Sequence, residues 1–84
     1  MMKSYKECAA YAQECMQKDE FMLFSDEEYN SYQVDFFIYG MCPSAYHIYL
    51  DGMVYIMCSE TAKRKLQEYA EAKSYQQLIN LLSI

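Results

Sequence analysis

The sequence predicts an α+β fold with the element order α-β-β-β-β-α-α, in which the strands form an antiparallel meander. Three observations support this prediction. Apolar residues recur at helical spacing near both ends of the chain, short aromatic and β-branched runs fill the middle, and Asp51-Gly52 separates two of those runs. Because 54% of the 84 residues are hydrophobic, we expect one folded domain that spans residues 1–84.

The first helix is expected at residues 4–18. Ser4, followed three positions later by Glu7, is the pattern of a capping box, in which each side chain bonds the other residue's backbone N–H. The apolar positions that then recur at helical spacing are Tyr5, Cys8, Ala9, Ala12, Cys15 and Met16. The opposite face of this helix is polar and should face solvent.

The middle of the chain has the pattern of strands separated by turns. We expect strands at residues 21–24, 32–39, 45–50 and 53–58, with an acidic loop at 25–30 and a turn at 40–43. If the first of these runs is irregular, the sheet has three strands instead of four.

The last two strands are joined across Asp51-Gly52, a dipeptide typical of tight hairpins. A two-residue turn would pair Leu50 with Met53. A three-residue loop over residues 50–52, with Gly52 in the left-handed conformation of a bulge, would shift the pairing by one and exchange the faces. We predict the second register, because it separates the side chains more cleanly. It places Tyr46, Ile48, Val54 and Ile56 on one face and His47, Tyr49, Met53, Tyr55 and Met57 on the other.

Two helices are expected after the strands, and the helices should pack on one face of the sheet. Ser59 can cap the first of them, whose apolar stripe is Ala62, Leu66, Tyr69 and Ala70. Ser74 with Gln77 has the pattern of a capping box that opens the second. The apolar positions of that helix are Tyr75, Leu78, Ile79, Leu81 and Leu82.

Charge is strongly segregated along the chain. Residues 19–62 contain eight carboxylates and no lysine or arginine, whereas all seven basic residues lie outside this segment. The eight are Asp19, Glu20, Asp26, Glu27, Glu28, Asp35, Asp51 and Glu60. A field of one sign attracts basic partners and repels nucleic acid, so we expect a protein partner and no direct binding to DNA or RNA.

The residues that usually carry enzymatic or metal chemistry are sparse. His47 is the only histidine, no C-x-x-C pair occurs, and no phosphate-binding glycine loop is present. We therefore expect no catalysis, no metal and no cofactor. Cys8 and Cys15 lie about 10 Å apart along one helix, too far for a disulfide. Four reduced thiols, without a secretory signal or a long apolar run, favour a cytoplasmic protein with no membrane contact.

An apolar face rich in aromatic and methionine side chains is predicted on the outer side of the sheet. Its residues are Phe37, Tyr39, Tyr49, Met53, Tyr55 and Met57. Such a face is too apolar to be left wet. Three arrangements would cover it: contact with another protein, a homodimer seam, or a helix of the same chain. The alternation along the strand places His47 beside it as a surface histidine.

The chain resembles the small acidic anti-CRISPR proteins of phages in its order of elements, its acidic loop, its Asp-Gly turn and its two C-terminal helices. Some members of that group block a Cas effector by occupying the site that binds DNA or reads the PAM. The basic run Lys63-Arg64-Lys65 departs from relatives that carry dense acids near their C-terminal helices. Mimicry of DNA would therefore have to come from acids of the sheet and its loops.

The resemblance implies a phage-encoded inhibitor that acts in the host cytoplasm on a basic nucleic-acid-binding protein, with a Cas effector as the expected partner. The expected contact residues are Asp19, Glu20, Asp26, Glu27, Glu28, Asp35 and Asp51, with Tyr29, Tyr32 and Tyr39 as aromatic anchors. Two other functions remain open: a homodimerising structural module, and an adaptor or antitoxin that neutralises a different basic partner.

Overall fold

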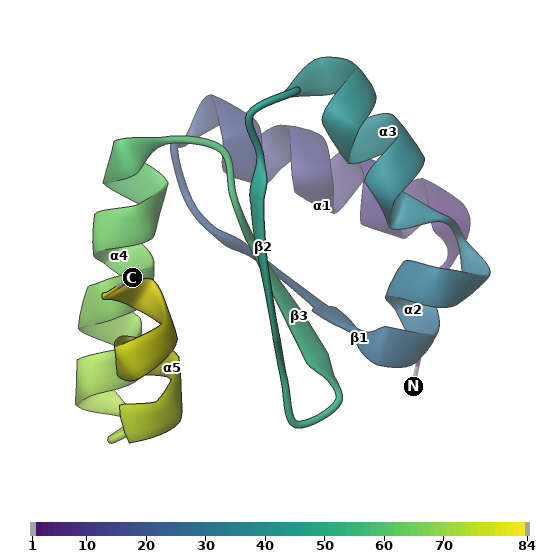
Figure 1. The fold of residues 1–84 in the computed structure, drawn as a ribbon. Coiled ribbons are helices and arrows are strands. Elements are labelled where there is room, and N and C mark those ends of the chain that lie inside the picture. The colour runs from purple at the N-terminus through teal and green to yellow at the C-terminus, as the bar shows by residue number, and fades with distance from the viewer. Residues whose placement is uncertain (1, 84) are drawn as a thin grey trace.

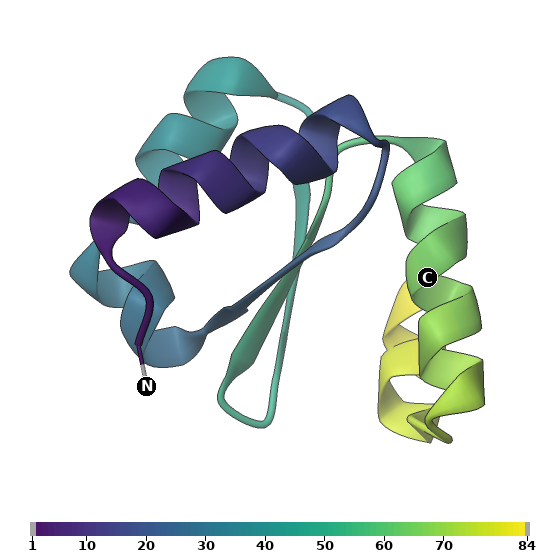
Figure 2. The same cartoon turned by 180° about the vertical axis from the view of Figure 1, so that it is seen from behind.

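One antiparallel sheet of three short strands lies between helices on both of its faces (Figures 1 and 2). The computed structural model describes residues 2–83 of the chain. Its elements are α1 (Tyr5–Gln17), β1 (Met22–Ser25), α2 (Asp26–Ser31), α3 (Val34–Met41), β2 (Tyr46–Leu50), β3 (Met53–Met57), α4 (Glu60–Ala72) and α5 (Gln76–Leu82). The predicted α+β class is confirmed.

The predicted acidic loop at 25–30 is wrong, because α2 begins directly after β1. Ser25 accepts the Glu28 N–H at 3.0 Å and the Glu28 carboxylate accepts the Ser25 N–H at 2.9 Å, so the two residues form a capping box. This is the same Ser-x-x-Glu pattern that predicts the start of α1, where the box between Ser4 and Glu7 is confirmed. The signal for α2 was therefore present in the sequence.

The predicted strand at 32–39 is also wrong, because residues 34–41 form α3. Gln33 adopts a left-handed conformation with φ of 49° and separates α2 from α3. Val34 and Ile38, one helical turn apart, are fully buried in the core that α1 shares. The gain from burying this pair overrides the strand propensity of the aromatic and β-branched residues around them.

The sheet has the strand order β1-β3-β2, so it is not a simple meander. β3 lies in the centre and pairs antiparallel with both neighbours. Every residue from Val54 to Met57 is buried, as expected for a strand covered on both faces.

The hairpin uses the two-residue turn, and the predicted bulged register is wrong. Leu50 pairs with Met53 and Ile48 with Tyr55, while Asp51 and Gly52 both have positive φ, of 51° and 76°. Two such residues make the mirror-image turn that matches strand twist. The register places Val54 and Ile56 with His47 and Tyr49, and Tyr55 with Ile48. The division of side chains between the two faces does not predict the register here, because helices cover both faces of the sheet and both faces carry apolar side chains.

Each face of the sheet has its own core, so the prediction that all helices share one face is wrong. The first core joins Met22 and Phe24 of β1 and Val54 and Ile56 of β3 to α1, α2 and α3. The second core packs Ile48 of β2 and Tyr55 and Met57 of β3 against Ala62, Leu66 and Ala70 of α4 and Leu78 and Leu82 of α5. Figures 1 and 2 show these two groups of helices on opposite sides of the strands.

The C-terminal helices begin differently. Ser59 caps α4 as predicted, accepting the Ala62 N–H at 3.0 Å. Ser74 caps nothing; with φ of 60° it ends α4, and Tyr75 precedes α5 without a side-chain cap. The predicted capping box of Ser74 with Gln77 is wrong, because a left-handed residue that closes one helix cannot also hold the extended backbone of an N-cap.

Candidate functional site

Three of the predicted acids gather at one end of the sheet. Asp26 and Glu27 begin α2, and Asp51 lies in the turn between β2 and β3; all three are exposed. The backbone N–H of Asp26 donates to the carbonyl oxygen of Gly52 at 2.8 Å, which holds the start of α2 against the turn. We call Asp26, Glu27 and Asp51 the acidic tip. Within residues 2–83, no ion pair involves a carboxylate of the acidic tip.

Asp19 and Glu20 lie away from the acidic tip, at the opposite end of β1. In Figure 1 the link from α1 to β1 is at the top of the molecule and the hairpin turn at the bottom. The Lys65 ammonium of α4 donates to the Lys18 carbonyl oxygen at 3.0 Å, which places a positive charge next to Asp19. The structure therefore does not bring these two acids together with the rest of the predicted contact set.

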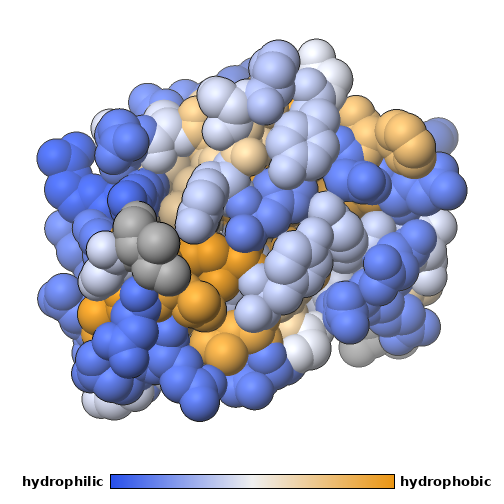
Figure 3. Space-filling model, viewed as in Figure 1, coloured by the Kyte–Doolittle hydropathy of each residue, from blue (hydrophilic) through white to orange (hydrophobic). Residues whose placement is uncertain are grey.

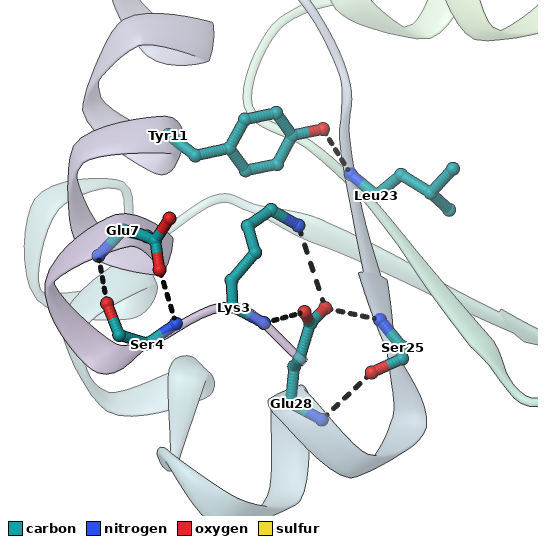
Figure 4. Close-up of polar contacts among 7 residues, drawn as sticks. All are labelled: Lys3, Ser4, Glu7, Tyr11, Leu23, Ser25 and Glu28. Carbon is teal, nitrogen blue, oxygen red and sulfur yellow. Dashed lines mark hydrogen bonds and ion pairs between the residues drawn. The ribbon is translucent and has the colours of Figure 1, made fainter. Parts of the chain in front are cut away.

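Glu28 is a structural residue, with only 4% of its surface exposed. Its carboxylate accepts the N–H of Lys3 at 2.8 Å and of Ser25 at 2.9 Å, and lies 3.7 Å from the Lys3 ammonium (Figure 4). Burial alone would raise the pKa of Glu28, but the hydrogen bonds from Lys3 and Ser25 outweigh it and hold the pKa below its usual range. Glu28 thus fastens the N-terminal segment to the start of α2.

The predicted aromatic anchors fall into two groups. Tyr29 is buried, and Tyr32 is half-buried with its ring edge-on to Tyr5 at 6.0 Å between centroids. Tyr39 of α3 is 44% exposed and remains available to a partner. Sequence reasoning missed Phe36 of α3, which at 71% is the most exposed large apolar side chain among residues 2–83.

A chain of hydroxyl groups joins the sheet to α2. Tyr49 donates to the Tyr29 hydroxyl at 3.0 Å, and the Tyr29 hydroxyl lies 3.0 Å from Nδ1 of His47. With its oxygen accepting from Tyr49, Tyr29 is free to donate to Nδ1, which leaves the proton of the neutral imidazole on Nε2. Nε2 is buried and has no hydrogen-bond partner among the described residues. The Tyr39 ring stacks on His47 at 4.7 Å, so His47 is half-covered and not the surface residue predicted.

These surroundings keep His47 neutral. Burial lowers the pKa of His47, and the negative charge of Asp35, in the first turn of α3, opposes this only in part. Burial and then the hydrogen bond with Tyr49 raise the pKa of the Tyr29 hydroxyl. Tyr29 and His47 are therefore uncharged at neutral pH, and they contact the exposed rings of Tyr49 and Tyr39, respectively.

Part of the apolar face predicted on the outer side of the sheet is covered by the chain itself. Tyr55 and Met57 are 5% and 3% exposed, and Met53 is partly buried, all against the core that α4 and α5 complete. Phe37 and Tyr39 belong to α3 and not to the sheet. For Met53, Tyr55 and Met57, coverage by helices of the same chain is the arrangement found, whereas Tyr49 of the same predicted face is 56% exposed.

The cysteines are all reduced, with Cys8 and Cys15 buried and Cys42 and Cys58 half-buried. A surface hollow of about 420 Å³ lies beside Cys58, between the end of the hairpin strands and the start of α4. Burial and the neighbouring Cys42 thiol raise the pKa of Cys58 to about 12, so this thiol is protonated and a weak nucleophile at neutral pH.

Residues 2–83 contain neither a cluster of potential metal ligands nor a helix that could span a membrane. No group of three or more His, Cys, Asp or Glu side chains in that range is placed to hold a metal ion. No helix in the same range is long and apolar enough to cross a membrane.

Comparison with protein-family models, curated protein sequences and solved structures found no match to this chain. The residues of this surface that are placed to meet a partner are those of the acidic tip, Asp35, and the exposed Tyr39 and Tyr49.

Proposed function

We propose that this protein is a non-catalytic, phage-encoded inhibitor that binds the nucleic-acid site of a Cas effector through its acidic surface. The observation that carries the proposal is the acidic tip, where Asp26, Glu27 and Asp51 from separate elements are exposed and unpaired at one end of the molecule. A basic groove that evolved to hold phosphates would accept carboxylates spaced along such an edge.

The contact surface proposed is smaller than the set expected from sequence. It comprises the acidic tip together with Asp35, Tyr39 and Tyr49. Exposed tyrosine rings supply flat contact area at low entropic cost and are common at the centres of interfaces. Glu28 and Tyr29 support this surface from inside, and Asp19 and Glu20 lie too far along the molecule to join it. The proposed location is the cytoplasm of the bacterial host.

A competition assay tests the proposal. Guide-loaded Cas effectors are titrated with the protein while anisotropy of a labelled target DNA reports its release. A triple variant of the acidic tip (Asp26→Asn, Glu27→Gln, Asp51→Asn) should weaken inhibition by about 1–3 kcal/mol, provided those charges are desolvated in the complex. The matched control, Asp19→Asn with Glu20→Gln, removes charge at the other end and should inhibit almost as well as the wild type.

Salt separates electrostatic mimicry from other modes of binding. If carboxylates and phosphates compete for the same Lys and Arg side chains, affinity should fall steeply between 50 and 200 mM salt, an effect of roughly tenfold or more. Simultaneous binding of the protein and DNA at saturating concentrations would exclude occlusion. Equal inhibition by the triple variant and the control would exclude the acidic tip as the contact.

A further inference from the structure

The two edges of the sheet differ in how their backbone groups are used. In an antiparallel ladder, alternate residues of a strand point their N–H and C=O groups toward the same neighbour. The Asp26 N–H bond to Gly52 continues the pairings of Phe24 with Val54 and Met22 with Ile56, so these residues bond across β1 and β3. Met53, Tyr55 and Met57 of β3 therefore form their backbone hydrogen bonds with β2. The alternate residues of β2 point their N–H and C=O groups away from the sheet.

The edge of β1 is closed by side chains of the same molecule. Its outward N–H groups belong to Leu23 and Ser25. The Leu23 N–H donates to the Tyr11 hydroxyl of α1 at 2.9 Å, and the Ser25 N–H donates to the Glu28 carboxylate of α2 at 2.9 Å (Figure 4). Another strand cannot pair here without displacing both acceptors.

The edge of β2 is open. Its outward backbone groups belong to His47 and Tyr49, and no hydrogen bond within residues 2–83 reaches them. The strand, Tyr46–Leu50, contains no charged residue and no proline, and its pairing with β3 runs without a bulge. Natural edge strands usually carry one of those devices against unwanted pairing. Tyr46 and Tyr49 are 50% and 56% exposed on its two faces.

The surface around this edge fits an extended chain. In Figure 3, which has β2 toward the viewer, hydrophobic surface lies beside β2 on its side toward α5, and pale to hydrophilic groups lie over the strand itself and at the margins. A strand added beside β2 would take its main-chain hydrogen bonds from His47 and Tyr49 and lay alternate side chains against the two exposed tyrosines.

We propose that the free edge of β2 binds an extended, basic segment of a partner protein by strand addition. Charge selects this occupant. Asp51 directly follows β2, and residues 19–62, which include this strand, contain no lysine or arginine, so a segment bearing lysine or arginine is attracted to the site. A second copy of the chain, with its own formal charge of −5, would be repelled. The inference rests on the proposed choice of a basic protein partner, and not on that partner being a Cas effector.

The test uses the whole protein and a defined probe, a blocked eight-residue peptide of alternating lysine and valine. Peptide binding should slow hydrogen exchange at the His47 and Tyr49 amides by roughly tenfold at saturation and leave the α4 amides unchanged. The same peptide N-methylated at alternate backbone positions, and one with glutamate in place of lysine, should give no protection. Protection confined to the acidic tip, or equal binding of the methylated peptide, would overturn strand addition.

Two variants at one position sharpen the result. Tyr49→Pro removes the outward N–H, while Tyr49→Thr keeps it; both lose the ring and its hydroxyl bond to Tyr29. The proline variant should bind the peptide roughly fivefold to tenfold more weakly than the threonine variant, since one backbone hydrogen bond is lost. Equal affinities would contradict the proposal. If the proline variant does not fold, the methylated peptide and the wild-type exchange pattern decide alone.

Sedimentation of the wild type addresses the alternative occupant. A monomer near 10.0 kDa at micromolar concentration leaves the edge free as proposed, and a dimer that protects the same two amides would overturn the choice of partner. The two proposals can fail separately. Peptide binding at β2 without DNA competition would defeat the Cas effector alone, and DNA competition without amide protection would defeat strand addition alone.

Discussion

Replacing Glu28 with alanine should destabilise the fold far more than replacing its neighbour Glu27. Glu28 accepts two backbone N–H groups, at 2.8 Å and 2.9 Å, and is 4% exposed, whereas Glu27 is exposed. Loss of the carboxylate leaves the N–H groups of Lys3 and Ser25 without an acceptor and removes half of a capping box. Hydrogen bonds to a charged group and one cap together predict a cost of about 2–4 kcal/mol.

The assay is urea unfolding followed by circular dichroism, with Glu27→Ala as the matched control. A loss of about 2–4 kcal/mol corresponds to a fall in Tm on the order of 10–30 °C for a domain of this size, and the control should stay close to the wild type. Glu28→Gln should lie between them, because an amide oxygen can accept one N–H but its NH₂ group faces the other donor.

The pH dependence gives an independent check on the same residue. The pKa of Glu28 is lower in the folded protein than its ordinary value of 4.5, so the unfolded chain binds the proton more tightly. Its contribution to stability is therefore complete above about pH 4.5 and is lost as the pH falls through the folded pKa. Glu28→Gln should remove that part of the pH profile. Equal urea midpoints for Glu28→Ala and Glu27→Ala would refute the role assigned to this residue.

Three other predictions concern the turn, the histidine and the thiols. Gly52→Ala should cost about 1 kcal/mol in urea unfolding, because φ of 76° strains any residue with a Cβ; an unchanged midpoint would argue against the mirror-image turn. Burial lowers the pKa of His47 below 6.5, so the free energy of unfolding should fall as the pH drops from about 6.5 toward the folded pKa. His47→Gln should flatten this pH dependence, and an unaltered dependence would mean that another group titrates. Thiol titration of the native protein should find Cys8 and Cys15 unreactive, since burial excludes the reagent and raises the pKa of each thiol. All four thiols should react in denaturant. Rapid reaction of all four without denaturant would contradict the buried positions.

Local signals in the sequence were sufficient for α1, α4 and the position of the hairpin. The boxes and caps at Ser4 and Ser59 bring together groups a few residues apart, and Asp51-Gly52 specifies a turn by its own backbone preferences. These interactions are complete within one short segment, so the sequence determines them without reference to the rest of the fold. The same pattern at Ser25 also marks the start of α2, a segment for which the acidic composition predicts a loop.

Long-range packing decided the rest. Residues 34–41 are helical because Val34 and Ile38 meet the core of α1, and the hairpin register follows from helices that cover both faces of the sheet. Glu27 and Glu28 are adjacent in sequence and identical in type. The local capping box with Ser25 selects Glu28, and the approach of Lys3 from 25 residues away completes its burial, while Glu27 stays exposed. Likewise, the closing of one sheet edge and the opening of the other depend on where α1 and α2 place Tyr11 and Glu28. Sequence determined the charge of this protein and the capped starts of α1, α2 and α4. Tertiary contacts decided which of its acids and strand edges are exposed to a partner, because burial and pairing depend on residues distant in the chain.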